Sequence, residues 1–133
     1  MISIGILLIR LVIGILFIGH GAQKLFGWFG GHGLQGTGGW FDSIGIKPGV
    51  TMALVAGLVE LVSGVMFALG LLTPLAAIMI AGTMIISIVK VHGSNGLWAQ
   101  ANGYEYNLTL LAVAIGIALI GPGHFALDSF LFQ

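Results

Sequence analysis

Four long apolar segments, at residues 2–26, 50–72, 74–91 and 104–120, dominate the sequence. A helix needs about 20 mostly apolar residues to cross the roughly 30 Å of hydrocarbon in a bilayer, and the four segments meet or approach that length. Only four Lys/Arg and four Asp/Glu occur in 133 residues, whereas about a quarter of the residues of a soluble domain are charged. A chain this small cannot bury so much apolar surface in its own core. We therefore predict an all-α, single-domain, integral membrane bundle of four transmembrane helices in the cell membrane.

The residues between the apolar segments indicate where the helices begin and end. Thr73 and Pro74 are typical of a helix N-cap and a first helical position, which predicts a tight hairpin between the second and third spans. Asn102 and Glu105 have the spacing of a capping box that would begin the fourth helix. An even number of spans places the two long connections on one side of the bilayer and both termini on the other.

The long connections are residues 27–49 and 93–103. The first is rich in glycine and carries Trp28 and Trp40, and the second carries Trp98. Indole rings favour the boundary between membrane and water. We expect residues 27–49 to lie on the bilayer or to cap the bundle, with a single helical turn at residues 40–44.

Charge and cysteine content exclude several classes of protein. The formal net charge is zero and no basic run is present, so we expect no nucleic-acid partner. The chain has no cysteine, which removes disulfides, thiolate metal sites and a cysteine redox relay.

Polar residues inside the spans are the best candidates for function. Glu60 lies at the midpoint of the second span, with small residues on its own helix face and bulky aliphatic residues on the opposite face. A charge at the bilayer centre costs at least about 2.5–3.5 kcal/mol, so such a residue normally faces a protein interior and has a role. We predict that Glu60 handles a proton together with His20 of the first span, as the two candidate catalytic residues.

Six further polar residues lie on the first, third and fourth spans or directly after them. At a rise of about 1.5 Å per residue, Glu60 lies about 15 Å below the loop side and the deepest of the six about 24 Å. Together these residues predict a polar chamber that opens on the loop side and reaches mid-membrane. The candidate substrate-binding residues are Arg10, Lys24, Lys90, His92, Glu105 and Asn107.

A purely structural alternative stands beside this prediction. Arg10 and Glu60 would neutralise each other as a buried pair, and Lys90 and Glu105 would do the same. We expect no metal site, because the sequence has no Glu-x-x-His and no closely spaced pair of histidines. His20 and His92 lie near the same surface on two helices, the minimum for axial haem ligation, but no paired histidine pattern recurs within a helix, so haem is not expected.

The motifs of the chain resemble those of the DoxX family of small membrane proteins. Arg10 followed by residues 20–27 (His-Gly-Ala-Gln-Lys-Leu-Phe-Gly) is similar to the family's first-helix signature. The second helix, the hairpin and the fourth helix are similar in order over nearly the whole chain, through Gly57-x-x-Glu60, Leu69-Gly-Leu-x-Thr73, Glu105-Tyr-Asn107 and Gly121-Pro-Gly with Asp128. Two positions depart from the family pattern, because Pro74 and His124 stand where an arginine is frequent.

The resemblance implies a four-helix membrane bundle and an association with redox chemistry, as a subunit of quinone-linked systems or in the response to oxidant and quinone stress. Resemblance to a family supports an inference about the fold more strongly than one about the reaction, because one fold can carry many functions. The first hypothesis is a membrane subunit that binds a lipophilic quinone in the chamber, with a soluble oxidoreductase partner or as a homo-oligomer. The alternatives are a small proton-coupled transporter or exporter that uses Glu60, and a structural membrane scaffold for a soluble oxidoreductase.

Overall fold

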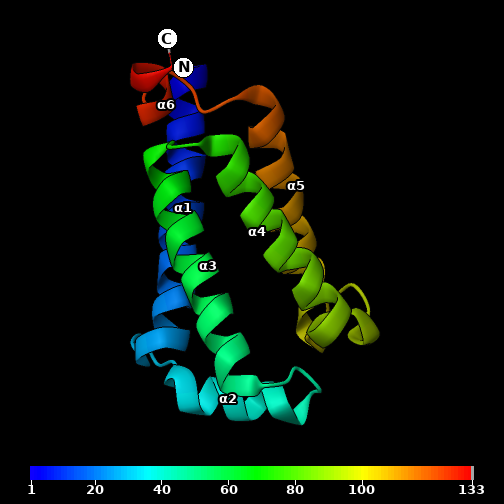
Figure 1. Ribbon diagram of the computed structural model, residues 1–133. Helices are drawn as coiled ribbons and strands as arrows, with labels where there is room; N and C mark the ends of the chain where they lie inside the picture. Colours follow the sequence, from blue (N-terminus) through cyan, green and yellow to red (C-terminus); the bar gives the residue numbers. More distant parts are fainter. Residues whose placement is uncertain (133) are drawn as a thin grey trace.

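The computed structural model describes residues 1–132 as an all-α bundle (Figure 1). Three helical stretches are long and apolar enough to cross a membrane: α1 (Ile2–Phe26), α3 (Gly49–Leu69) and Thr73–Asn95, whose first part is α4 (Thr73–Ser87). A shorter apolar helix, α5 (Glu105–Ile120), accompanies them. The prediction of an all-α, helical membrane protein is confirmed.

The helices pack as two pairs, α1 with α3 and α4 with α5. The pairs meet near the end that carries both chain termini and diverge towards the other end (Figure 1). Their shared core begins at the terminal end and extends to mid-bundle, and it is made of Ile6, Ile13, Phe17, Phe67, Ala76, Ala77, Ile80, Met84, Leu110, Ala114 and Ile117. The bundle is therefore wedge-shaped, tight at the terminal end and open at the loop end.

Glycines bring α1 and α3 into close contact. An added Cβ on Gly64 would lie 2.7 Å from the carbonyl oxygen of Gly14 and 2.8 Å from the amide nitrogen of Ile18. Close approach through small residues is a common way for membrane helices to associate, because lipid offers them no hydrophobic driving force.

We expect Gly64→Ala to lower the free energy of unfolding by about 2 kcal/mol, because the methyl group overlaps backbone atoms that cannot move aside easily. Gly116→Ala is the matched control, since a Cβ at Gly116 of α5 meets nothing within 4 Å. Alanine's higher helix propensity should make that variant neutral or slightly more stable. Unfolding in detergent micelles measures both, and equal effects of the two changes would contradict this packing.

The open end of the wedge is covered by α2 (Gly33–Ser43) and by the connection after α4 (Figure 1). The expectation of a single turn at residues 40–44 is wrong, because the helix has 11 residues. Glycine disfavours helices, but tertiary contacts outweigh that preference here: Gly38 packs against Val50 and the ring of Phe41 is buried.

The connection after α4 is also more regular than a loop. The α-helix passes into a π-helix, η1 (Ile88–His92), and then into a 3₁₀ turn, η2 (Gly93–Asn95). A second 3₁₀ turn, η3 (Ala99–Ala101), precedes α5. The third predicted span, residues 74–91, therefore ends in a π-helix, a feature that often marks functional sites.

Two of the predicted helix caps differ in the structure. The α3–α4 hairpin is as tight as expected, but Thr73 makes no side-chain cap, and the Asp128 carboxylate accepts the N–H groups of Leu72 (2.6 Å) and Thr73 (2.8 Å) instead. The capping box of Asn102 and Glu105 is absent. Asn102 adopts a left-handed conformation, and Glu105 accepts the Ala99 N–H at 3.1 Å.

Asp128 belongs to α6 (Leu127–Leu131), which folds back onto the terminal end of the bundle (Figure 1). Arg10 lies beneath it and is 1% exposed. Its guanidinium donates to the carbonyl oxygens of Ala68 (3.3 Å) and Phe125 (2.5 Å). Burial alone raises the pKa of Asp128, but hydrogen bonds from Thr73 and Leu72 and the Arg10 charge outweigh it and lower the pKa below its usual value. We call this arrangement the terminal clasp.

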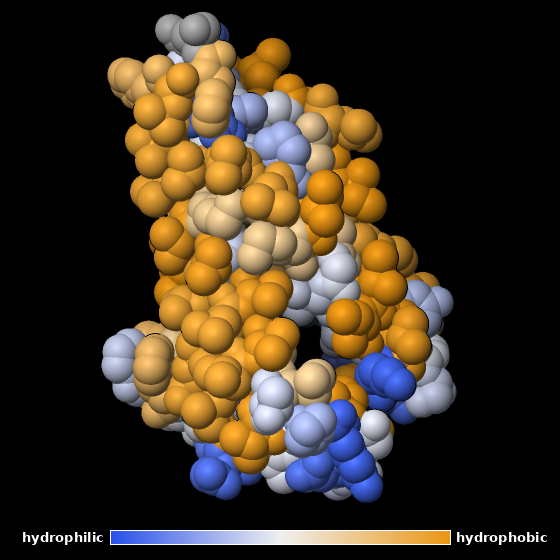
Figure 2. All heavy atoms as spheres, viewed as in Figure 1, coloured by the Kyte–Doolittle hydropathy of each residue, from blue (hydrophilic) through white to orange (hydrophobic). Residues whose placement is uncertain are grey.

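The outer surface agrees with a membrane environment. Hydrophobic residues cover most of the visible face along the helices, and hydrophilic residues gather at the end that carries α2 and the long connections (Figure 2). Ile78 and Leu119, for example, are 66% and 83% exposed. Exposed apolar surface on this scale is stable only against lipid.

Candidate functional site

A cavity of about 420 Å³ occupies the wedge between the two helix pairs at the loop end. We call it the chamber. Every element of that end contributes to its wall: α1, α2, α3, α4, η1, the 93–103 connection and α5. The space-filling view shows a hollow in this part of the molecule (Figure 2). The site residues that line the chamber are His20, Lys24, Glu60, Lys90, His92 and Asn107.

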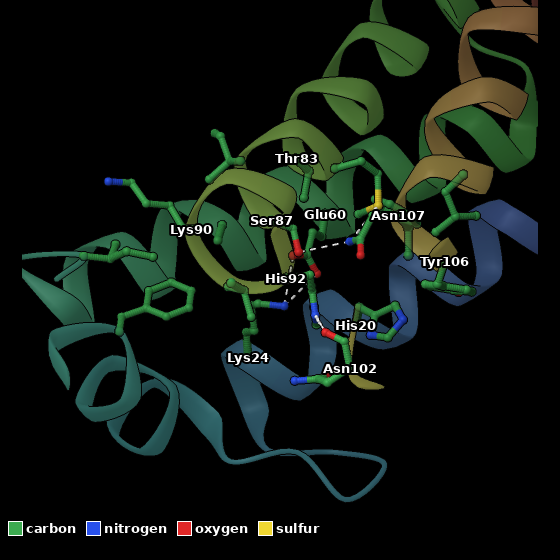
Figure 3. Close-up of a pocket in the computed structure, with 18 of the residues that line it drawn as sticks. His20, Lys24, Glu60, Thr83, Ser87, Lys90, His92, Asn102, Tyr106 and Asn107 are labelled. Carbon is green, nitrogen blue, oxygen red and sulfur yellow. Dashed lines mark hydrogen bonds and ion pairs between the residues drawn. The ribbon is translucent and has the colours of Figure 1, made fainter. Parts of the chain in front are cut away.

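Lys24 and Glu60 form an ion pair on the chamber wall (Figure 3). The ammonium of Lys24 lies 2.9 Å from Oε1 and 3.1 Å from Oε2 of Glu60. The Glu60 side chain is 7% exposed and that of Lys24 22%. Gly57, one turn from Glu60, lets α3 approach Leu25 and Lys24 closely. The alternative in which Arg10 pairs with Glu60 is wrong: Lys24 neutralises Glu60, and this is the only ion pair within residues 1–132.

His20 lies one turn before Lys24 on α1 and also faces the chamber. Its Nδ1 is 3.2 Å from Oε1 of Gln23, and its ring meets Phe17 edge-on at a centroid distance of 6.4 Å. Gln23 in turn donates to the carbonyl oxygen of Phe29 at 3.1 Å. The imidazole is thereby held against α1, and its second ring nitrogen is available to a ligand.

Asn107 supplies the polar group on the opposite wall. Its amide donates to the Ser87 hydroxyl at 3.0 Å and to the Met84 sulfur at 3.6 Å (Figure 3). The π-helix turns His92 to the chamber mouth, where its Nδ1 lies 2.9 Å from the carbonyl oxygen of Asn102. Polar groups therefore converge on the cavity from both helix pairs.

Three predicted binding residues play a smaller part in the chamber, or none. Lys90 touches its edge but is exposed and points away from the Lys24–Glu60 pair (Figure 3). Glu105 lies outside it and holds the Ala99 N–H, and no ion pair joins it to Lys90 among the described residues. Arg10 belongs to the terminal clasp at the other end of the bundle.

The sequence prediction missed the aromatic part of the wall. Trp40 and Phe41 of α2 close the chamber from the loop end, and Tyr106 of α5 borders it. The signal was the Trp-Phe pair inside a glycine-rich stretch, which we expected to lie on the bilayer or to cap the bundle without assigning it to the site. Tyr106 of α5 and Ile86 of α4 are 47% and 60% exposed, so each of these wall residues lies between the chamber and the outer surface of the bundle.

This arrangement can bind a largely apolar molecule that carries a hydrogen-bonding head. Phe17, Phe41 and Leu110 supply apolar contacts, while the Lys24 ammonium and the Ser87 hydroxyl supply donors and Glu60 an acceptor. A few placed polar groups within an apolar lining are typical of small-molecule sites. No three His, Asp or Glu side chains in residues 1–132 gather closely enough to hold a metal ion.

Comparison with known proteins assigns the family. The DoxX family matches residues 5–93, which include both members of the ion pair. The chain belongs to the DoxX family. The resemblance in its motifs is thus confirmed.

Three DoxX relatives cover nearly the whole chain. "Putative oxidoreductase CatD" of Bacillus subtilis is 35% identical over 98% of this chain and 90% of its own length. "Uncharacterized membrane protein Rv3486" of Mycobacterium tuberculosis is 32% identical over 92% and 78%. "Inner membrane protein YqjF" of Escherichia coli is 28% identical over 97% and 93%. No solved structure matches the chain. The apolar helices and these relatives identify a multi-pass protein of the cell membrane.

Proposed function

We propose that this DoxX protein binds the head group of a lipophilic quinone in the chamber and exchanges protons with it. The observation that carries the proposal is the buried Lys24–Glu60 ion pair, at 2.9 Å, on the wall of an otherwise largely apolar cavity. A relative that bears the name of an oxidoreductase supports a redox setting.

The chemistry of a quinone fits the donors and acceptors present. Its ring packs on aromatic and aliphatic side chains, and its two carbonyl oxygens accept hydrogen bonds, which the Lys24 ammonium and the Ser87 hydroxyl offer from opposite walls. Reduction to the quinol takes up two electrons and two protons. Glu60, with His20 beside it, can transfer protons at the ring oxygens, and protein carboxyl and imidazole groups are the usual carriers. The electrons come from a partner, for which we propose a soluble oxidoreductase.

We propose that such a molecule enters from the bilayer through the side of the chamber at Tyr106. Tyr106 of α5 lines the chamber and is 47% exposed. A hydrophobic quinone tail would remain in lipid while the head enters. We also propose that α5 makes a fourth crossing, since its 16 residues extend about 24 Å at 1.5 Å per residue and return the chain to the terminal end (Figure 1).

Tryptophan fluorescence tests the proposal. Quinones quench nearby indole rings, and of Trp28, Trp40 and Trp98 only Trp40 lines the chamber. We expect a short-chain ubiquinone analogue to quench the wild type saturably in nanodiscs. Trp40→Phe should lose the saturable part, whereas Trp28→Phe and Trp98→Phe should keep it. Glu60→Gln should raise the Kd of the quinone analogue by about tenfold or more.

Saturable quenching that is unchanged in Trp40→Phe would overturn the site, and quenching without saturation would overturn quinone binding. If quenching does not saturate, measurements on the same protein in liposomes distinguish the two alternative functions. Proton flux that depends on an added substrate and is lost in Glu60→Gln would indicate a proton-coupled transporter. Absence of both activities would favour a scaffold.

A further inference from the structure

A second cavity, of about 640 Å³, lies outside the chamber at the loop end. It is formed by the last turn of α1, by residues 30–32 and by α2. No aliphatic side chain lines it: its wall consists of Gln23, Lys24, Gly30, Gly31, His32, Gly36, Thr37 and Trp40. Its wall is more polar than that of the chamber, which favours water over a quinone ring. We call this space the outer cavity.

The outer cavity and the chamber share two wall residues, Lys24 and Trp40. The Lys24 ammonium contacts Glu60 at 2.9 Å, so the side chain that faces the outer cavity also holds the buried carboxylate. Trp40 is 47% exposed and stands between the two spaces. The ion pair therefore lies where the more polar outer cavity and the largely apolar chamber meet.

A second polar link crosses at the same place. Gln23 lines the outer cavity, and its Oε1 lies 3.2 Å from Nδ1 of His20, which lines the chamber. Adjacent residues of α1, Gln23 and Lys24, thus each connect the outer cavity to one of the two candidate proton-handling residues. His32 adds a third titratable group to the outer wall.

Local packing keeps the outer cavity in shape. Gln23 anchors the connection through its bond to the Phe29 carbonyl oxygen. Gly31 lies directly against Gln23, where an added Cβ would overlap both backbone and side-chain atoms. At the far side, Gly38 of α2 touches the backbone of Val50, which fixes α2 on α3. The cavity is part of the packed structure of this end.

We propose that the outer cavity is a water-filled inlet that carries protons from the loop side to Glu60, with Trp40 separating it from the quinone chamber. The Lys24 ammonium passes one of its protons to the Glu60 carboxylate, and the amine takes a proton from a hydronium ion in the inlet, which leaves a water molecule. Lipophilic ligand and proton then arrive by different routes, one from the bilayer and one from water. This inference extends the proposed function, since it names the proton source of the same site.

Because the chain has no cysteine, each introduced thiol is the only one present. We choose Thr37→Cys as the variant in the outer cavity, and Asn95→Cys as its matched control on a surface that lines neither cavity. A charged, membrane-impermeant methanethiosulfonate is added to the protein in nanodiscs. We expect Thr37→Cys to react, although Thr37 is 8% exposed, because water fills the space beside it.

The proton route is then measured by infrared spectroscopy at acidic pH, where the carbonyl band of the protonated Glu60 is assigned by its loss in Glu60→Gln. We expect the modified Thr37→Cys protein to exchange this proton for deuterium about tenfold or more slowly than the unmodified protein. Modification of Asn95→Cys should leave the rate unchanged.

Unchanged exchange after modification of Thr37→Cys would overturn the inlet. If that variant does not fold, His32→Cys on the same wall replaces it, and failure of either folded variant to react would show that water does not fill the cavity. Neither measurement uses a quinone. Unchanged deuterium exchange together with saturable quinone quenching would overturn the inlet alone. Slowed exchange without saturable quenching would overturn quinone binding alone.

Discussion

Lys24→Met is expected to lower the free energy of unfolding by about 3 kcal/mol, because it leaves the Glu60 carboxylate buried without a counter-charge. Breaking a buried pair from one side costs about 3–5 kcal/mol in general. The lower end applies here, since the Lys24 side chain is 22% exposed and its pair is partly screened by water. Reversible unfolding in mixed micelles measures the change.

A double-mutant cycle of Lys24 and Glu60, measured as free energies of unfolding, provides the control. Glu60→Gln should cost less than Lys24→Met, because the long lysine side chain can extend to water when its partner is neutral. The double variant Lys24→Met/Glu60→Gln should recover most of the stability lost in Lys24→Met, since no unpaired charge remains. It should still fail to bind the quinone analogue. A double variant as unstable as the sum of the two single changes would contradict a direct interaction.

Arg10→Met is expected to lower the free energy of unfolding by about 3 kcal/mol through loss of the terminal clasp. The guanidinium is 1% exposed and bonds the carbonyl oxygens of Ala68 and Phe125, so its removal leaves buried acceptors unpaired and frees the tail from α3. Lys47→Met, on an exposed lysine, is the matched control and should change stability by about 0.5 kcal/mol or less. Quinone binding should survive in Arg10→Met protein that remains folded, because Arg10 lies outside the chamber.

The clasp also predicts a pH dependence. The pKa of Asp128 is lowered in the folded protein, so its ionised form contributes stability that is complete above the unfolded value of about 3.9 and is lost as the pH falls through the lower folded value. Wild-type protein should therefore lose stability in that acidic range. Asp128→Asn should cost about 1–2 kcal/mol at neutral pH, as removal of a helix cap does, and should show a smaller loss on acidification. Identical acid profiles of the two proteins would contradict the clasp.

Apolar length and rare charge were sufficient to predict the helical membrane fold and the first helix, residues 2–26, to its exact bounds. They also predicted that polar residues gather at the loop end, and six of the eight named site residues do line one cavity. Helical periodicity carried this result, because it shows which residues share an inward face. It does not show which helices become neighbours.

The partner of Glu60 illustrates that limit. The structural alternative paired Glu60 with Arg10, because two opposite charges inside the bundle can neutralise each other. The structure places Lys24 against Glu60 because Gly21 and Gly57 set the register of α1 on α3, and the flexible lysine stem reaches inward from near the surface. Arg10 is bound instead by a tail more than a hundred residues away, a contact that no local pattern reports.

The connections were the least predictable part. A stretch as rich in glycine as residues 33–39 has low helix propensity, and only its packing against α3 stabilises α2. The wall residue Trp40 follows from that packing. In the same way, the π-helix that turns His92 inward depends on the contacts of the 93–103 connection, including the bond to the Asn102 carbonyl oxygen.

We propose above all that a quinone head occupies the chamber beside Lys24 and Glu60. Cross-linking of a photoreactive ubiquinone analogue in nanodiscs, mapped by peptide mass spectrometry, tests this placement most directly. We predict cross-links on the chamber wall, at Trp40, Tyr106 or the 83–92 stretch, that are competed by unlabelled quinone and reduced in Glu60→Gln. Cross-links confined to the lipid-facing surface, at positions such as Ile78 and Leu119, would contradict it.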